Sequence, residues 1–155
     1  MKNTDVLVVG GSAAGLTSAL ASKSHYPEKS VTLVRKEKKV AIPCGIPYIF
    51  GTMENTDQDI LPDAGLQKAG VDIVVDEISL IDAETKTARL KDGEEISFDK
   101  LILATGSRPV VPQWLKGAEL RNVFTVPKNL DYLDAIKKQL NDIHALLVIG
   151  AGVIG

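Results

Sequence analysis

The N-terminal strand, glycine turn and helix constrain the fold more than any other part of the sequence. Residues 5–9 form a short apolar run rich in β-branched side chains, which predicts a buried strand. The turn Gly10-Gly11-Ser12-Ala13-Ala14-Gly15 follows, residues 15–24 predict a helix, and residues 31–34 predict a second strand. This order is that of a βαβ unit, whose parallel strands are buried on both faces.

The rest of the chain predicts helices and strands in a less regular order. Residues 43–51 predict a loop that opens into a helix, because proline is tolerated in a first helical turn. A weak helical pattern follows at 57–70, and residues 72–103 predict several short strands that include a hairpin. Residues 128–141 predict another helix, and residues 145–149 predict a further buried strand. We therefore expect a three-layer α/β fold of the nucleotide-binding type, with antiparallel strands inserted into a parallel sheet.

Composition narrows the class of protein. Of the 155 residues, 45% are apolar and 25% charged, which is the balance of an ordinary globular protein. The net charge is -2 and the basic residues are scattered among acidic ones, so we expect no nucleic-acid partner. The first apolar run is far shorter than the roughly 20 residues that span a bilayer, which predicts no membrane association and a cytoplasmic location. His25 and His144 have no second ligand nearby in sequence, so we expect no metal.

The first glycine turn has the composition of a dinucleotide-binding motif. Its small residues allow backbone N–H groups to approach a pyrophosphate at the N-terminus of a helix. A carboxylate usually ends the second strand of such a unit and binds the adenosine ribose, but this strand ends in Val34-Arg35-Lys36-Glu37. Either Glu37 reaches back to the ribose, or Arg35 and Lys36 line the adenosine end instead.

The pattern of an apolar strand and a glycine turn recurs at the end of the sequence. Gly150, Gly152 and Gly155 have the spacing of a second dinucleotide motif, without the helix that would complete it. We therefore expect two nucleotide sites, of which the second is truncated.

The single cysteine is the other chemical signal. Cys44 stands between Pro43 and Gly45 at an expected helix start, where the positive end of the helix dipole favours a reactive thiolate. The alternative is a small buried apolar side chain. Ile49 stands where a Cys-x4-Cys pair would have its second cysteine, so Cys44 would need a sulfenate or an external thiol partner.

Four segments in order, residues 8–15, 43–48, 103–109 and 148–155, resemble the FAD-dependent pyridine nucleotide-disulfide oxidoreductases. The resemblance covers essentially the whole chain and is to the single-cysteine group of CoA-disulfide reductases, NADH oxidases and NADH peroxidases. It implies a Rossmann-like FAD- and NAD(P)-binding fold that is truncated at its C-terminal end. Residues 1–110 would then be the first segment of the FAD-binding domain, and residues 111–155 a linker and the start of the NAD(P)-binding domain.

The resemblance also implies roles for individual residues. Cys44 would be the nucleophile and redox relay, with FAD as cofactor and NADH or NADPH as co-substrate. The substrate would be a small thiol or disulfide, such as one linked to CoA, and the whole protein a homodimer. The implied cofactor-binding residues are Gly10, Ser12, Ala13, Ala14 and Gly15 at the pyrophosphate, Ile78 at the adenine, Thr105 and Gly106 near the flavin, and Pro43 beside the cysteine.

One departure from the family pattern bears on the substrate. Peroxidases and water-forming oxidases of the group carry a histidine in the first glycine turn, where this sequence has Ala13. The resemblance therefore favours a CoA-disulfide or CoA-persulfide reductase. Two alternatives stay open: an NADH oxidase that reduces dioxygen with Cys44 as a sulfenate, and a non-catalytic flavin-binding module.

Overall fold

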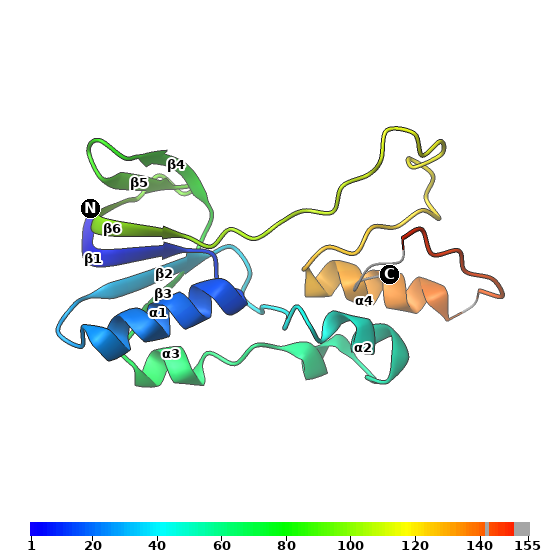
Figure 1. Ribbon diagram of the computed structural model, residues 1–155, viewed down its shortest axis with the longest axis horizontal. Helices are drawn as coiled ribbons and strands as arrows, with labels where there is room; N and C mark the ends of the chain where they lie inside the picture. Colours follow the sequence, from blue (N-terminus) through cyan, green and yellow to red (C-terminus); the bar gives the residue numbers. More distant parts are fainter. Residues whose placement is uncertain (142, 151–155) are drawn as a thin grey trace. The chain divides into compact units, whose positions relative to one another are not determined.

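A computed structural model describes residues 1–141 and 143–150, and its chain divides into two compact units (Figure 1). The first unit consists of Met1–Val40 and Leu61–Ser107, and the second of Ala41–Ile60 and the chain from Arg108 onward. The elements of the first unit are β1 (Lys2–Val9), α1 (Ala13–His25), β2 (Val31–Arg35), α3 (Ala64–Lys68), β3 (Asp72–Val75), β4 (Ile78–Asp82), β5 (Thr87–Leu90) and β6 (Glu95–Leu103). Those of the second are α2 (Ile46–Gly51), the 3-10 helix η1 (Thr56–Asp59) and α4 (Leu130–Leu140).

One six-stranded sheet in the order β3-β2-β1-β6-β5-β4 forms the centre of the first unit. Strand β1 pairs in parallel with β2 and β6, and β2 pairs in parallel with β3. Strand β5 pairs in an antiparallel sense with both β4 and β6. The predicted parallel sheet with inserted antiparallel strands is therefore confirmed.

Alternate side chains of β1 enter two different cores, because successive residues of a strand point to opposite faces. Val8 belongs to a cluster with Ala19 of α1 and Leu66 of α3, on the face that these helices cover. Leu7 belongs to a second cluster with Ala88 and Leu90 of β5. The β4–β5 hairpin thus covers the other face of the parallel strands, which completes the three layers.

The second unit has its own small core. Ile46 and Ile49 of α2 are buried against Leu130 and Leu133 of α4. Helix α2 begins with Pro47 in its first turn, where the missing N–H group removes no hydrogen bond. Helix α4 begins at Asn129, whose side chain accepts a hydrogen bond from the N–H of Tyr132.

Two sequence-based expectations need correction. The helical pattern at 57–70 is split into η1 and α3 because Pro62 lies between them and cannot continue a helix. The strand expected at 145–149 is absent: these residues form no regular element and are exposed, with Leu147 at 82% and Val148 at 54% exposure. A parallel strand forms only where neighbours accept its hydrogen bonds, and within residues 1–141 and 143–150 no strand pairs with this segment.

A lysine from α4 holds the C-terminal end of α2. Lys137 Nζ donates a hydrogen bond of 2.7 Å to the carbonyl of Ile49 and another to the carbonyl of Met53. Carbonyls at the end of a helix lack partners within it, so a charged donor stabilises them. We expect Lys137→Met to lower the free energy of unfolding by about 1–3 kcal/mol in urea denaturation.

Lys138→Met is the matched control for this variant. Lys138 is the next residue of α4, and its side chain is 74% exposed and paired only with Asp134. An exposed pair of this kind contributes little to stability, because solvent screens the two charges. Equal losses in the two variants would contradict the capping role of Lys137.

Candidate functional site

The first glycine turn lies at the carboxyl end of β1, between β2 and β6. The Gly10 N–H donates to the carbonyl of Val34 at 2.8 Å, and the Ala104 N–H donates to that of Val9 at 2.8 Å. The chain leaves β1 through α1 to β2 on one side, while β6 pairs on the other. Ligands of open α/β sheets bind at such a switch point.

Close backbone contacts require glycine at two positions of the turn. Gly10 has φ +112°, and a β-carbon there would lie 2.1 Å from the Ala104 carbonyl oxygen. A β-carbon at Gly15 would lie 1.8 Å from the carbonyl oxygen of Gly10. The first turn of α1 therefore sits directly on the backbone that ends β1.

The N-terminus of α1 has the features of an anion site. Ser12 is the N-cap residue, but its side chain makes no capping hydrogen bond, and the first turn contains no acidic residue. Within the described residues the buried Ser12 Oγ has no hydrogen-bond partner. Helix N–H groups, a helix dipole and an unpartnered hydroxyl together fit the pyrophosphate of a dinucleotide. Ser12, Ala13 and Ala14 would hold this group.

Arg35 packs beneath the turn rather than projecting into solvent. It is 5% exposed, and a β-carbon at Gly11 would lie 2.4 Å from its Cδ. Its guanidinium donates to both carboxylate oxygens of Asp63 at 2.6 Å and to the carbonyl of Lys38 at 3.1 Å. Lys36 is more open, with a side chain 56% exposed, 3.8 Å from Glu37. The expected contact of Arg35 and Lys36 with adenosine stays a prediction.

The other expected cofactor residues fall into two groups. Thr105 and Gly106 belong to the first unit and follow Ala104, which touches the glycine turn. Ile78 also belongs to this unit, where it pairs with Leu90 and packs against the core cluster that contains Leu7 and Ala88. Pro43 and Gly150 belong to the second unit. Gly152 and Gly155 lie outside the described residues.

Cys44 is an exposed free cysteine in the second unit. Its loop is closed by a hydrogen bond of 2.8 Å from the Gly45 N–H to the carbonyl of Ile42. Helix α2 begins after Cys44 as expected, with Gly45 as its N-cap, but it spans only six residues. So short a helix aligns few peptide dipoles, and the expected activation of the thiol by a helix terminus therefore has little support.

Asp59 was not expected from the sequence, and among the described residues it is the most fully buried acidic side chain. Asp59 is 1% exposed, and within the described residues neither carboxylate oxygen has a hydrogen-bond partner. Burial raises the pKa of this carboxyl above its ordinary value. A carboxylate next to Ile60 and Leu61 was the available sequence signal, but nothing in sequence connects it with Cys44.

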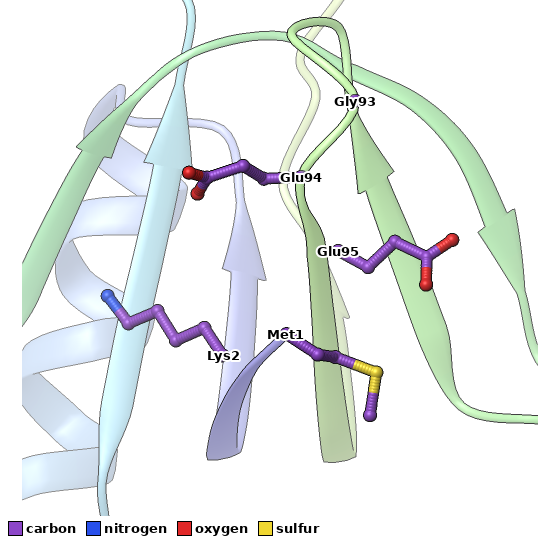
Figure 2. Close-up of a pocket in the computed structure, with 5 residues that line it drawn as sticks. All are labelled: Met1, Lys2, Gly93, Glu94 and Glu95. Atoms are coloured by element: carbon purple, nitrogen blue, oxygen red, sulfur yellow. The ribbon is translucent and has the colours of Figure 1, made fainter.

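A second hollow in the first unit lies at the opposite end of β1 from the glycine turn. Figure 2 shows Met1, Lys2, Gly93, Glu94 and Glu95 around it, and its volume is about 450 Å³. Two of these side chains form ion pairs, Lys2 with Asp72 and Glu95 with Arg89. This hollow contains no nucleophile and no buried unpartnered group, so the glycine turn is the stronger candidate.

Residues 1–141 and 143–150 contain neither a cluster of metal ligands nor a helix that could cross a membrane. No three His, Cys, Asp or Glu side chains lie close enough together to hold a metal ion. No helix in this part of the chain is long and apolar enough to cross a membrane.

Comparison with known proteins identifies the family. The sequence model of the pyridine nucleotide-disulphide oxidoreductase family matches residues 4–155. The chain belongs to this family. Enzymes of the family bind FAD and NAD(P)H, so the expected family and cofactors are confirmed.

Relatives of this chain have several activities in their names. An NADH oxidase of Methanocaldococcus jannaschii is 33% identical over 96% of this chain and 35% of that protein. A CoA-dependent NAD(P)H sulfur oxidoreductase of Pyrococcus abyssi is 32% identical over 97% of this chain and 35% of that protein. The solved structure of an NAD-dependent persulfide reductase from A. fulgidus matches 90% of this chain and 28% of its own, with 27% identity and a TM-score of 0.76. The chain thus spans 35% of the length of each of these two curated relatives.

The close backbone approach at Gly15 can be tested by a substitution. Gly15→Ala places a methyl group against the Gly10 carbonyl, which no rotamer change relieves. We expect a loss of about 3 kcal/mol in the free energy of unfolding and at least a tenfold loss of FAD affinity, measured by urea denaturation and flavin fluorescence titration.

Gly65→Ala is the control for this variant. A β-carbon at Gly65 in α3 would meet only Leu20 Cδ1, at an ordinary contact distance of 3.9 Å. Alanine also favours a helix by about 1 kcal/mol over glycine, so this variant is expected to be neutral or more stable. Similar losses in both variants would mean that the close approach at Gly15 has no special role.

Arg35→Lys keeps the positive charge beneath the turn and tests the pair of hydrogen bonds that Arg35 makes with Asp63. Lysine cannot form the two parallel hydrogen bonds that arginine makes with Asp63, so we expect a loss of about 2 kcal/mol in the free energy of unfolding. Asp63→Asn should give a similar loss. Lys36→Met should leave stability unchanged, because Lys36 is exposed. A fall in FAD affinity in Lys36→Met would support the adenosine contact, and unchanged FAD affinity in both Arg35→Lys and Lys36→Met would argue against it.

Proposed function

We propose that this chain is the FAD-binding part of an NAD(P)H-dependent oxidoreductase that reduces a disulfide or persulfide of a small thiol such as CoA. The observation that carries the proposal is the exposed lone Cys44 on its hydrogen-bonded loop, in a chain whose α1 N-terminus fits a pyrophosphate. The names of the relatives support it, since one acts on sulfur with CoA and one structural neighbour reduces persulfides.

The chemistry proposed for Cys44 is thiol–disulfide exchange. The Cys44 thiolate attacks one sulfur of the substrate disulfide and forms a mixed disulfide, and the other half leaves as a thiolate. Two electrons, for which NADH or NADPH is the source, then cleave the S–S bond of the mixed disulfide, which returns Cys44 to the thiolate and releases the second half of the substrate as a thiolate. FAD, when bound, supplies the two-electron chemistry that links a nicotinamide to a thiol. The role of the chain is to hold FAD at the glycine turn and to present the thiol.

Ala13 supports a reductase over a peroxidase. This residue occupies the first position of α1 and is exposed, and its methyl group neither donates nor accepts a proton. Peroxide chemistry benefits from a proton donor at the reacting oxygen. The alternative function is an NADH oxidase, which the name of the Methanocaldococcus relative favours.

The arrangement of the whole protein is part of the same proposal. Residues 1–110 would supply the first segment of the FAD-binding domain, and residues 111–155 a linker and the start of the NAD(P)-binding domain. Gly150, with φ +125°, would begin the nicotinamide turn. The assembled enzyme would be a homodimer.

Cys44→Ser tests the proposed function. We expect the variant to bind FAD, and its flavin absorption to be bleached by NADH as in the wild type. Its reduction of CoA disulfide should fall to the background rate, because serine cannot form a mixed disulfide. Visible absorption reports the flavin, and mass spectrometry of the wild type should show a CoA adduct on Cys44.

Oxygen uptake separates the two candidate functions. Rapid NADH-dependent oxygen uptake without any disulfide, together with slow disulfide reduction, would favour the oxidase. A colourless protein, or full disulfide reduction by Cys44→Ser, would overturn the proposal.

A further inference from the structure

Gly11 and the side chain of Arg35 fit closely against each other at the first glycine turn. The three atoms that a β-carbon at Gly11 would meet first all belong to Arg35: Cδ at 2.4 Å, Cβ at 2.8 Å and Cγ at 3.2 Å. Gly11 does not have a positive φ, so its backbone conformation alone does not require glycine. The lack of a side chain at Gly11 therefore matches the arginine stem, which packs against the turn.

Two other segments of the first unit hold the guanidinium of Arg35 in place. It donates to both carboxylate oxygens of Asp63 at 2.6 Å and to the carbonyl of Lys38 at 3.1 Å. A long arginine side chain without such partners has many rotamers open to it. The pair with Asp63 therefore fixes the stem against which Gly11 rests.

The carboxylate of Asp63 is used for this pair and not for its own helix. Asp63 is the N-cap residue of α3, where aspartate usually accepts a hydrogen bond from the helix, but its side chain makes no capping hydrogen bond. Helix α3 is anchored, because Leu66 is fully buried in the core cluster with Val8 and Ala19. Asp63 thus holds Arg35 from a segment that is itself fixed to the sheet.

The burial of the pair favours support of the turn over direct contact with a ligand. The side chain of Arg35 is only 4% exposed, so little of it can reach a bound molecule. Gly11 directly precedes Ser12, whose buried hydroxyl has no hydrogen-bond partner within the described residues. Backbone N–H groups that bind a pyrophosphate must be held within a fraction of an ångström of their productive positions.

We propose that Asp63 is a positioning residue of the dinucleotide site, which acts through Arg35 on the glycine turn. The carboxylate fixes the guanidinium, and the arginine stem fixes Gly11. The turn then presents the N–H groups at the start of α1 to a pyrophosphate. The proposal rests on the FAD site of the proposed function, and it names a residue outside the turn that determines the affinity of that site.

The flavin affinity of the full chain tests this role. FAD is titrated against the wild type, Asp63→Asn, Arg35→Met and the double variant, with flavin fluorescence as the readout and circular dichroism as the check of folding. We expect the FAD dissociation constant to rise about tenfold in Asp63→Asn. Arg35→Met keeps a stem under Gly11 but not its hydrogen bonds, so a similar rise is expected. The double variant should bind FAD no more weakly than Arg35→Met, because Asp63 acts only through Arg35.

Two further variants control for charge and for stability. Asp72→Asn removes the carboxylate of another aspartate of the first unit, whose ion pair with Lys2 lies at the amino ends of β3 and β1, away from the turn. Ile96→Val removes a methyl group from the core cluster on the opposite face of the sheet, which lowers the free energy of unfolding without changing the turn. Both variants should keep the FAD dissociation constant within about twofold of the wild-type value.

Several outcomes would overturn the proposal. These are wild-type FAD affinity in Asp63→Asn, an equal loss of affinity in Ile96→Val, losses of the two single variants that add in the double variant, or a wild type that binds no FAD. If Asp63→Asn does not fold, Asp63→Glu decides, because it keeps the charge but moves the carboxylate by one methylene group. It should raise the FAD dissociation constant by about threefold or more, and an unchanged value would overturn the proposal.

These measurements use neither NAD(P)H nor a disulfide. Weaker FAD binding in Asp63→Asn, without disulfide reduction by the wild type, would leave the positioning role standing and remove the proposed function. Unchanged FAD binding in Asp63→Asn, with full disulfide reduction by the wild type, would do the reverse.

Discussion

The first unit depends on a close approach of backbone segments at the end of β1. The Gly10 carbonyl occupies the place of a β-carbon at Gly15, and the Ala104 carbonyl occupies that of a β-carbon at Gly10. A side chain at either glycine would lift α1 away from the sheet and separate β1 from the segment after β6. Because these contacts are tight, the N–H groups that begin α1 are held at the switch point of the sheet, where a dinucleotide pyrophosphate can reach them.

The two units differ in how many hydrogen-bond partners they give to a buried charged side chain. In the first, Arg35 and Asp63 satisfy each other through two hydrogen bonds, and the arginine stem fills the space beneath Gly11. A buried ion pair of this kind joins segments that are far apart in sequence. In the second unit, Asp59 receives no such compensation. The compensation of Arg35 is itself incomplete, since among the described residues its buried Nε has no hydrogen-bond partner, whereas Asp59 has none through either carboxylate oxygen.

The division into two units places the cofactor turn and the thiol in different parts of the molecule. The glycine turn belongs to the first unit, while Cys44 and Asp59 belong to the second. The first unit thus contains the helix N-terminus that fits a pyrophosphate, and the second contains an exposed thiol.

Local patterns in the sequence were sufficient for most of the architecture and for the glycine turn. Apolar runs and small residues determine where strands end and a helix begins, because strand burial and tight turns depend on neighbouring residues. The prediction of a strand at 145–149 was wrong because a strand also needs neighbouring strands to accept its hydrogen bonds, which no local pattern supplies. For the same reason the sequence could not predict that Arg35 pairs with Asp63, 28 residues away, or that Asp59 lies against Gly45. Those contacts were decided only by the tertiary structure, since burial and charge pairing depend on which distant segments the fold brings together.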